Sequence, residues 1–560
     1  MIARLNSGES SNELVRGSPT CRETRYVSIV RDRLVESSDM VEILAARDAA
    51  GLPIDVDHQS ISHLLHDGFV PPPRTVYRDI YTLGMDLEAK RSGGYLAFER
   101  NFPYTNGKSS QAGVPSTRTL LTLLAAAVES ACATRDEAFL SLSSGVDSTS
   151  LAVAAKEAGR DDLLCVTYGE SPEDFEINYA RRTCASLGLR HVSHILDPKD
   201  SAIQETLRDY ASGCAQPCCD PALIADVSMV ARFGESRSVM LDGSGSDFYF
   251  WRPPARRLDL IKTRLGFGQL PPFHRVRALV PMDFWGERIL ATPPELMLLH
   301  GVWLRFYETR QFYPNATDTH PYWIGQLAYS ASFPREERQH CLKMAYMAPA
   351  AYMMKTRNAV SAFRAKAQFP WTDQTVADYC FNLPENARFN RATKVSKVIV
   401  RQMLSETLDY DHRSVGKRTF SFGKRDFLLN HLEFCREEIL SCTLWSTTIV
   451  SAFNKLARKL ERGGQTENAL LSLLMVSLWH NRWINGSMRG HIRKCHSLRV
   501  DAEDPAADIT VARFAGMRAE RRHAQACPSG PCVRNQDFPD GGVTSPRSPV
   551  QQPSAVHSTS

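Results

Sequence analysis

The chain has 560 residues, of which 43% are hydrophobic and 23% charged, so it can bury a full core and is expected to hold two or three domains. Its 67 basic and 62 acidic residues leave a net charge of +5, which is too small for this length to indicate nucleic acid. Residues 1–30 lack a secretory signal, and apolar runs such as 120–128 are shorter than the roughly 20 residues that span a bilayer, so we expect a cytoplasmic protein without a membrane partner.

The fourteen cysteines give no sign of a metal site or of a disulfide framework. Cys214 and the pair Cys218-Cys219 lie close together in sequence, but no two C-x-x-C pairs have a zinc spacing. We therefore expect reduced thiols.

Residues 1–112 are expected to form a small β-rich domain. Short β-like runs occur at 25–30, 75–82, 81–87 and 93–98, and the three prolines at 71–73 read as a rigid link into the second of them. The composition turns polar over 105–113, which marks a domain boundary.

Residues 113–497 are expected to form the main domain. Ser116 is a candidate N-cap for a helix through 120–128, and this helix leads into a strand at 139–142. Strands then alternate with helices, with strands at 163–168, 191–196 and 238–241 and helices at 148–158, 173–187 and 222–233. This alternation predicts an α/β fold with a parallel sheet whose ligands lie at the carboxyl ends of the strands.

From residue 250 onward the pattern is mostly helical, and we expect an α-helical extension packed on the sheet. Helices are predicted at 393–404 and 469–480, and Trp479 and Trp483 are interpreted as core residues. Residues 498–560 are rich in Ala, Arg, Pro, Ser and Gly and are expected to form a disordered tail.

A Ser- and Gly-rich turn at 143–148 separates the strand at 139–142 from the following helix. Backbone N–H groups of such a turn and the positive end of the helix can hold a phosphate, and Ser143, Ser144 and Ser148 add hydroxyl donors. Asp147 can hold Mg²⁺ against the phosphate oxygens. The alternative is an ordinary polar connection between a strand and a helix.

A second turn of this kind, at 242–247, follows the strand at 238–241. Two strand ends of one sheet, each with a small-residue turn and an aspartate, could hold one Mg²⁺-pyrophosphate unit between Asp147 and Asp247. A solvated turn aspartate is the alternative for Asp247.

The first turn resembles S-G-G-x-D-S, the pyrophosphate loop of the ATP pyrophosphatases, with Ser144 at the first Gly. The two turns together resemble the synthetase domain of the asparagine-synthetase type, whose second motif is S-G-x-G-[AS]-D, with Asp242 at the position of the Ser. Four further segments are similar to segments of the family, and they lie at 176–181, 369–373, 397–401 (K-x-x-x-R) and 413–420. The likeness covers roughly residues 60–430.

This resemblance implies a fold of the ATP-pyrophosphatase (adenine nucleotide alpha hydrolase-like) type and an enzyme that activates a carboxylate with ATP and Mg²⁺, then forms an amide with release of AMP and pyrophosphate. It also implies which residues take part. Asp147 and Asp247 would bind the metal, and ATP would contact Leu142, Ser143, Ser144, Gly145, Asp147, Ser148, Asp242 and Gly243.

Lys417 would stabilise charge that develops during catalysis. The alternative for Lys417 is a surface lysine, and Lys424 is the next candidate for the catalytic role.

Two departures from the family narrow the expected product. Ile2 stands where full asparagine synthetases carry the cysteine nucleophile, so residues 1–112 resemble a reduced amidotransferase domain without glutaminase activity. Ser244 replaces the Glu of asparagine synthetases and the Tyr of β-lactam-forming relatives. We take Ser244 as a second catalytic-site candidate that contacts nucleotide or substrate.

These features look most like the lasso-peptide macrolactam synthetases, which join an Asp or Glu side chain of a short peptide to the peptide's own N-terminal amine. The resemblance implies a ribosomal precursor peptide as substrate and a leader peptidase or leader-binding protein of the same pathway as partner. The alternatives are a small-molecule amide synthetase, forming asparagine or a β-lactam, and an inactive nucleotide-binding scaffold.

Overall fold

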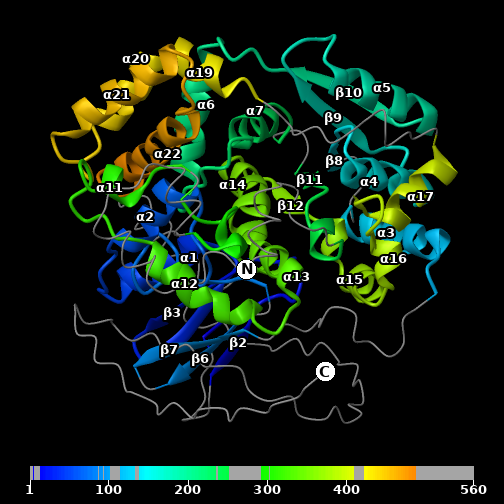
Figure 1. Ribbon diagram of the computed structural model, residues 1–560, viewed down its shortest axis with the longest axis horizontal. Helices are drawn as coiled ribbons and strands as arrows, with labels where there is room; N and C mark the ends of the chain where they lie inside the picture. The colour runs from blue at the N-terminus through cyan, green and yellow to red at the C-terminus, as the bar shows by residue number, and fades with distance from the viewer. Residues whose placement is uncertain are drawn as a thin grey trace, which may run out of the picture.

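A five-stranded parallel sheet, in the upper right part of Figure 1, is the main sheet of the computed structural model and supports the predicted α/β fold. The structure describes residues 4–5, 13–85, 87–92, 94–100, 114–132, 138–234, 238–250, 292–301, 303–408 and 422–486. The strand order is β10-β9-β8-β11-β12. The bounds are β8 Ala138–Ser141, β9 Leu164–Gly169, β10 Arg190–Ile195, β11 Val239–Leu241 and β12 Lys366–Gln368.

Helices cover both faces of this sheet because its strands alternate apolar side chains between two cores. Leu140 and Cys165 pack with helices α3, α4 and α5, whereas Phe139, Leu164 and Val166 pack with α6 and α7. Ser116 caps α3 by accepting from the Thr119 N–H, as predicted. The bounds are α3 Thr117–Ala131, α4 Val146–Glu157, α5 Phe175–Leu187, α6 Ala202–Gly213 and α7 Leu223–Phe233.

The described residues after 291 are mainly helical, in agreement with the predicted extension. The α-helices are α11 Phe306–Thr309, α12 His320–Gln326, α13 Arg335–Leu342, α14 Met353–Ala362, α15 Gln374–Phe381, α16 Glu385–Arg388, α17 Val398–Thr407, α19 Lys424–Asn430, α20 Leu432–Leu440, α21 Ile449–Glu461 and α22 Glu467–Trp483. A π-helix, η5 Lys343–Tyr352, joins α13 to α14, and short 3-10 turns lie at η1 Ser246–Phe248, η3 Pro294–Leu296, η4 Leu327–Ser330 and η6 Pro370–Thr372. Trp479 and Trp483 on α22 are buried, as expected of core residues.

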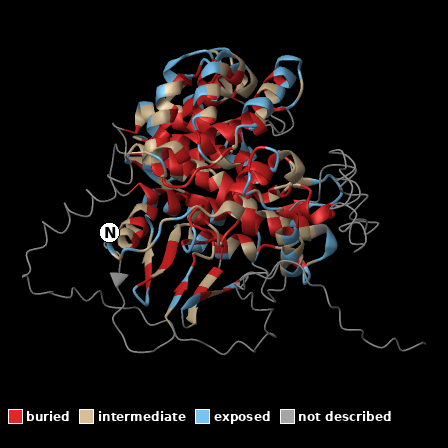
Figure 2. Cartoon of the chain, turned by 90° about the vertical axis from the view of Figure 1, so that its left-hand side faces the viewer, coloured by how far each residue is buried: buried red, intermediate tan, exposed pale blue. Residues whose placement is uncertain are grey.

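The N-terminal region contains two antiparallel sheets and two helices. One sheet has the order β1-β4-β3-β5, and the other has the order β2-β6-β7. The strands are β1 Arg4–Leu5, β2 Leu14–Arg16, β3 Arg25–Val30, β4 Arg33–Ser37, β5 Tyr81–Leu83, β6 Leu87–Ser92 and β7 Tyr95–Arg100, and the helices are α1 Met40–Ala49 and α2 His58–Asp67. Helix α2 packs against α22, so the two ends of the described chain share one core. Figure 2 shows buried residues running through the interior and exposed residues on the outer faces of the helices.

Two local predictions were wrong, and one strand was not predicted. The strand predicted at 75–82 is mainly a turn, because the Thr75 hydroxyl bonds to the Ile80 carbonyl and only Tyr81–Leu83 pairs with β3. The helix predicted at 393–404 begins only at Val398, after the short hairpin of β13 Phe389–Asn390 and β14 Val395–Ser396. Strand β12 was not predicted, because its Lys-Ala-Gln sequence is polar and only its parallel pairing with β11 defines it.

The predicted tail at 498–560 lies outside the described residues. The predicted boundary at 105–113 also lies outside them, between the described residues 100 and 114. No helix in the described part of the chain is both long and apolar enough to cross a bilayer. The described cysteines are buried free thiols.

Candidate active site

The first turn presents free backbone donors at the carboxyl edge of the sheet. Helix α4 begins at Val146, and its N-cap Gly145 offers no side chain to bond the first turn. No described residue accepts a hydrogen bond from the backbone N–H groups of residues 146–148. Since the positive end of α4 lies at the same point, this turn can hold an anion.

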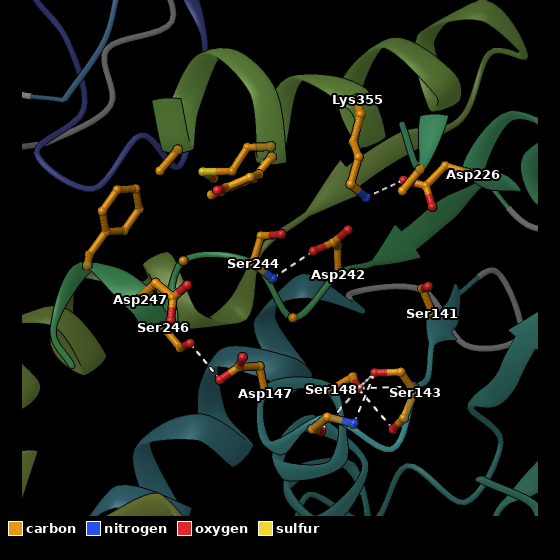
Figure 3. A pocket seen from close by; sticks show the side chains of 18 of the residues that line it. Ser141, Ser143, Asp147, Ser148, Asp226, Asp242, Ser244, Ser246, Asp247 and Lys355 are labelled. Atoms are coloured by element: carbon orange, nitrogen blue, oxygen red, sulfur yellow. Dashed lines mark hydrogen bonds and ion pairs between the residues drawn. The ribbon is translucent and has the colours of Figure 1, made fainter. Parts of the chain in front are cut away.

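Ser143 and Ser148 give the turn its shape. Their hydroxyl oxygens lie 2.8 Å apart, and the Ser148 hydroxyl accepts from the Ser143 backbone N–H at 3.0 Å. The Ser143 hydroxyl also accepts from the Gly145 N–H at 3.2 Å. Both side chains line the cavity in front of the sheet (Figure 3).

Ser144 and Leu142 are less directly placed for a ligand. The Ser144 N–H and hydroxyl donate to the two carboxylate oxygens of Glu176, at 2.6 and 2.8 Å, and its φ is not positive, so serine fits at this position. Leu142 is fully buried, with its N–H bonded to the Val166 carbonyl. Their contacts with ATP therefore remain predictions.

The second turn packs directly on the first. Asp242 shapes it, because one carboxylate oxygen accepts from the Ser244 N–H at 2.6 Å and the other from the Thr356 hydroxyl at 2.7 Å. Gly243 lies so close to α4 that a Cβ at this position would be 2.9 Å from the Ser148 backbone nitrogen. Only glycine fits there without moving the backbone.

We expect Gly243→Ala to lower the free energy of unfolding by about 1–3 kcal/mol, because the methyl group forces the two turns apart. Urea unfolding of the full chain measures this change. Gly325→Ala is the matched control, since nothing lies within 4 Å of the added Cβ and α12 gains a better helix former. Equal stability of Gly243→Ala and the unsubstituted protein would contradict the close packing of the turns.

The two predicted metal-binding aspartates meet at one lysine. Lys397 Nζ lies 2.7 Å from both oxygens of Asp147 and 2.7 Å from Oδ1 of Asp247. It also donates to the Ser246 hydroxyl at 2.9 Å, and that hydroxyl donates to Asp147 at 2.6 Å. The carboxylates come from turns after adjacent parallel strands, β8 and β11, so the sheet brings them together.

Lys397 is held in place by unusual backbone geometry. It is the N-cap of α17 and has φ +61°, in the left-handed region that lysine rarely adopts. Its N–H donates to the Arg388 carbonyl at 2.8 Å, and the residue is 8% exposed. The ammonium is therefore fixed before any ligand arrives.

The attraction between Lys397 and its two aspartates favours the charged forms of Lys397 and Asp247. Burial lowers the pKa of Lys397, but Asp147 and Asp247 outweigh it and raise the pKa above its ordinary value. Burial would raise the pKa of Asp247, but the Lys397 ammonium, helped by Lys343, holds it below its usual range. Asp147 and Asp247 line the cavity that holds the first turn, and the ammonium of Lys397 joins the two carboxylates.

The donor set fits a hydrated Mg²⁺ that is shared with phosphate. The described residues contain no group of three His, Cys, Asp or Glu side chains placed to hold a metal ion. Asp147 and Asp247 offer carboxylate oxygens, and Mg²⁺ commonly combines one or two carboxylates with substrate phosphates and water. The site thus suits a metal that arrives with a nucleotide.

The cavity of about 370 Å³ extends from the first turn to an apolar wall. The π-helix η5 supplies Met344, Ala348 and Tyr352 to that wall, together with Lys343, whose Nζ lies 5.1 Å from the centre of the Tyr352 ring. The Ser244 side chain also lines the cavity, and no described residue bonds to its hydroxyl.

The structure describes only one of the two candidate catalytic lysines, Lys424, and that lysine does not line this cavity. Lys417 lies outside the described residues. Lys424 begins α19 and donates to Asn468 Oδ1 at 2.9 Å, and it is not among the cavity-lining residues. Lys397 lies in the K-x-x-x-R segment but is not among the predicted site residues.

A family model described as asparagine synthase matches residues 119–481. The chain belongs to the asparagine synthase family. Members of this family are ATP-dependent ligases that form amide bonds. The family match includes both turns and Lys397.

Proteins that carry the name asparagine synthetase (glutamine-hydrolyzing) are similar to part of the chain. Those from Mycobacterium bovis and from two strains of Mycobacterium tuberculosis are 26% identical to it over 226 residues, which are 38% of this chain. The chain spans about a third (32%) of the length of each of these relatives.

Proposed function

We propose that this chain is an ATP- and Mg²⁺-dependent synthetase that closes a macrolactam ring in a ribosomal lasso precursor peptide. The observation that carries the ATP-dependent step is the meeting of Asp147 and Asp247 at Lys397, beside the free N–H groups of α4. Membership of the asparagine synthase family supports carboxylate activation followed by amide formation.

In this mechanism the first turn and α4 bind the phosphates of ATP, and Lys397 fixes the two carboxylates that face them. Mg²⁺, bound by Asp147 and Asp247, would neutralise phosphate charge. An Asp or Glu side chain of the peptide attacks the α-phosphorus, and pyrophosphate leaves. The peptide's N-terminal amine then attacks the acyl carbon, and AMP leaves as the amide forms.

Ser244 and the apolar wall support a peptide substrate. The Ser244 hydroxyl, which lines the cavity, can contact a peptide or a nucleotide, but it is a poor base at neutral pH. Met344, Met353 and Phe248 give the cavity an apolar surface that suits a chain larger than free aspartate.

The test offers the purified chain ATP, Mg²⁺ and synthetic peptides with a free N-terminal glycine and a single Asp or Glu at successive positions. The proposal predicts AMP, pyrophosphate and a peptide that has lost one water, and acetylation of the N-terminus prevents the ring. Conversion of free aspartate and ammonia to asparagine would instead favour the small-molecule alternative that the names of the relatives suggest. Absence of ATP–pyrophosphate exchange with every substrate would favour an inactive scaffold.

We expect Lys397→Met to lower AMP formation by about 10²–10³, the effect of removing one preorganised charged donor. The variant leaves Asp147 and Asp247 without their shared ammonium. Rapid-quench measurement of AMP checks this rate. Lys366→Met, which removes an exposed lysine on the edge strand β12, should keep the unsubstituted rate. Equal rates for both variants would exclude a role for Lys397.

We propose that Lys417 stabilises charge on the phosphates and the acyl oxygen during the reaction. Lys417→Ala is expected to keep ATP binding within several-fold and to lower turnover by about 10²–10³. Isothermal titration with a non-hydrolysable ATP analogue and single-turnover kinetics separate the two quantities. Cyclisation at the unsubstituted rate would place the catalytic lysine elsewhere, and Lys424→Ala would then be measured in the same way.

A further inference from the structure

An ion pair that the adenylation chemistry does not use lies on the cavity wall. Asp226 of α7 and Lys355 of α14 are joined by a contact of 2.5 Å between Oδ2 and Nζ. Their side chains are 4% and 16% exposed, and both residues line the cavity. Figure 3 places Asp242 and Ser244 between this pair and Asp147.

Both members of the pair keep unused hydrogen-bonding capacity. Lys355 donates to Oδ2 of Asp226, and the Thr356 hydroxyl, whose one proton has the nearer acceptor Asp242 at 2.7 Å, lies 3.3 Å from the same Oδ2. Within the described part of the chain, Oδ1 of Asp226 has no hydrogen bond, and Lys355 Nζ has Asp226 as its only acceptor. One carboxylate oxygen and up to two N–H donors are thus left for a ligand in the cavity.

The wall also carries excess negative charge. Asp226 and Asp242 line the cavity, and Asp220 precedes α7 in the same cluster, so three carboxylates surround the ammonium of Lys355. Burial lowers the pKa of Lys355, but these three carboxylates raise it above its ordinary value, so Lys355 stays charged. A second positive charge from a ligand would bring the cluster closer to neutrality.

We propose that Asp226 and Lys355 form the subsite for the substrate's attacking amine, with Oδ1 of Asp226 accepting from an α-ammonium group and Lys355 donating to the adjoining carbonyl oxygen. This proposal rests on the proposed function and names the part of the site that binds the nucleophile. The N-terminus of a peptide has an α-ammonium group next to an amide carbonyl. A free amino acid has the same ammonium group next to a carboxylate.

The subsite also supplies the proton acceptor that Ser244 does not. Burial raises the pKa of Asp226, which makes it a better acceptor at neutral pH. Asp226 takes one proton from the ammonium and becomes a carboxylic acid. The nitrogen lone pair then forms the C–N bond, the bond from the acyl carbon to the AMP oxygen breaks, and the second amine proton passes to a phosphate oxygen of the departing AMP.

The first test measures binding without chemistry. Glycinamide, which has an α-ammonium group and a carbonyl but no carboxylate, is titrated into the full chain by ligand-observed NMR. We expect saturable binding to the unsubstituted protein, at least about tenfold weaker binding to Asp226→Asn, and none for N-acetylglycinamide. Weaker binding of glycine than of glycinamide favours a peptide N-terminus, and tighter binding of glycine favours a free amino acid. Equal binding of glycinamide and N-acetylglycinamide would overturn the proposal.

The second test separates activation of the carboxylate from amine attack. Hydroxylamine, which is largely neutral at neutral pH, traps the activated carboxyl without a protein base. We expect Asp226→Asn to keep hydroxamate formation within several-fold and to slow ring closure by at least about 10². Glu438→Gln, which breaks a buried ion pair with Arg208 and Arg482 away from the cavity, is the matched control and should keep both rates.

Ring closure by Asp226→Asn at the unsubstituted rate would overturn the proposal. An equal loss of hydroxamate formation and of ring closure in a folded Asp226→Asn variant would overturn it too. If Asp226→Asn does not fold, Ala222→Leu makes the same test without changing a charge. Ala222 lines the cavity one turn before Asp226, so a larger side chain there should block the amine but not the phosphates. Failure of the unsubstituted chain to activate any peptide would count against the proposed function, while glycinamide binding would still report on the subsite.

Discussion

Replacing Asp147 or Asp247 by Asn is expected to reduce AMP formation by at least about 10³, because either change removes a negative charge that orients Lys397 and can bind Mg²⁺. Asn keeps the shape of the side chain, so each variant should fold. Quenched-flow measurement of AMP from ATP and peptide gives the rate, and the melting temperature shows whether the fold is retained.

Asp197→Asn is the matched control for both variants. Asp197 follows β10 on the same sheet and bonds to the Lys199 backbone N–H, but it does not line the cavity. AMP formation should be retained in this variant. Unchanged AMP formation in both Asp147→Asn and Asp247→Asn would refute the assignment of the two turns to the phosphate site.

Replacing Asp67 by Asn is expected to lower the free energy of unfolding by about 4 kcal/mol, the scale of breaking a buried ionic network. Asp67 is fully buried at the end of α2 and accepts from His63 and Trp323 through one oxygen, at 2.7 and 2.8 Å. Its other oxygen accepts from the His300 ring and the Gly301 N–H, both at 3.0 Å. An amide group would point N–H bonds at two of these four donors.

The lowered pKa of Asp67 supports the large loss of stability expected for Asp67→Asn. Burial would raise the pKa of Asp67, but His300, followed by His63, lowers it below its usual range, so the carboxylate is charged in the folded protein. Urea unfolding measures the difference. Asp174→Asn at the N-cap of α5 is the control, because among the described contacts its carboxylate bonds only to the Glu176 N–H and Asn caps a helix about as well as Asp, so the expected change is below about 1 kcal/mol. A similar small change for Asp67→Asn would show that its four bonds add little.

The parallel sheet could be predicted because its signals are local. The apolar run before Ser143 and the small residues after it identify β8, the turn and the start of α4. The same reasoning located β11 and the second turn, and the carboxyl ends of parallel strands must share one edge. A common edge for Asp147 and Asp247 could therefore be expected, but the structure was needed to show that β8 and β11 are adjacent strands.

Lys397 was missed as a site residue for a physical reason. The segment 393–404 looks helical throughout, but residues 393–397 form a hairpin end and a left-handed residue that only tertiary contacts stabilise. The available signal was the K-x-x-x-R likeness at 397–401. Similarly, Glu176 was noted in a family-like segment, but its bonds to Ser144 depend on how α5 packs beside the turn.

Asp226 and Lys355 had no local signal. They lie 129 positions apart on two helices, and each looks like an ordinary charged residue within a helical pattern. Their pairing arises from the packing of α7 against α14 on one face of the sheet. Long-range contacts of this kind require the three-dimensional structure.

In the proposed reaction the chain activates a carboxylate by joining it to AMP. The most direct test uses a peptide whose Asp or Glu side-chain carboxylate carries ¹⁸O, with ATP, Mg²⁺ and the unsubstituted protein, and follows the label by mass spectrometry. If both carboxylate oxygens are labelled, one ¹⁸O atom should appear in the phosphate of AMP for each ring formed. Ring formation with unlabelled AMP, or with ADP and labelled inorganic phosphate, would contradict the proposed reaction.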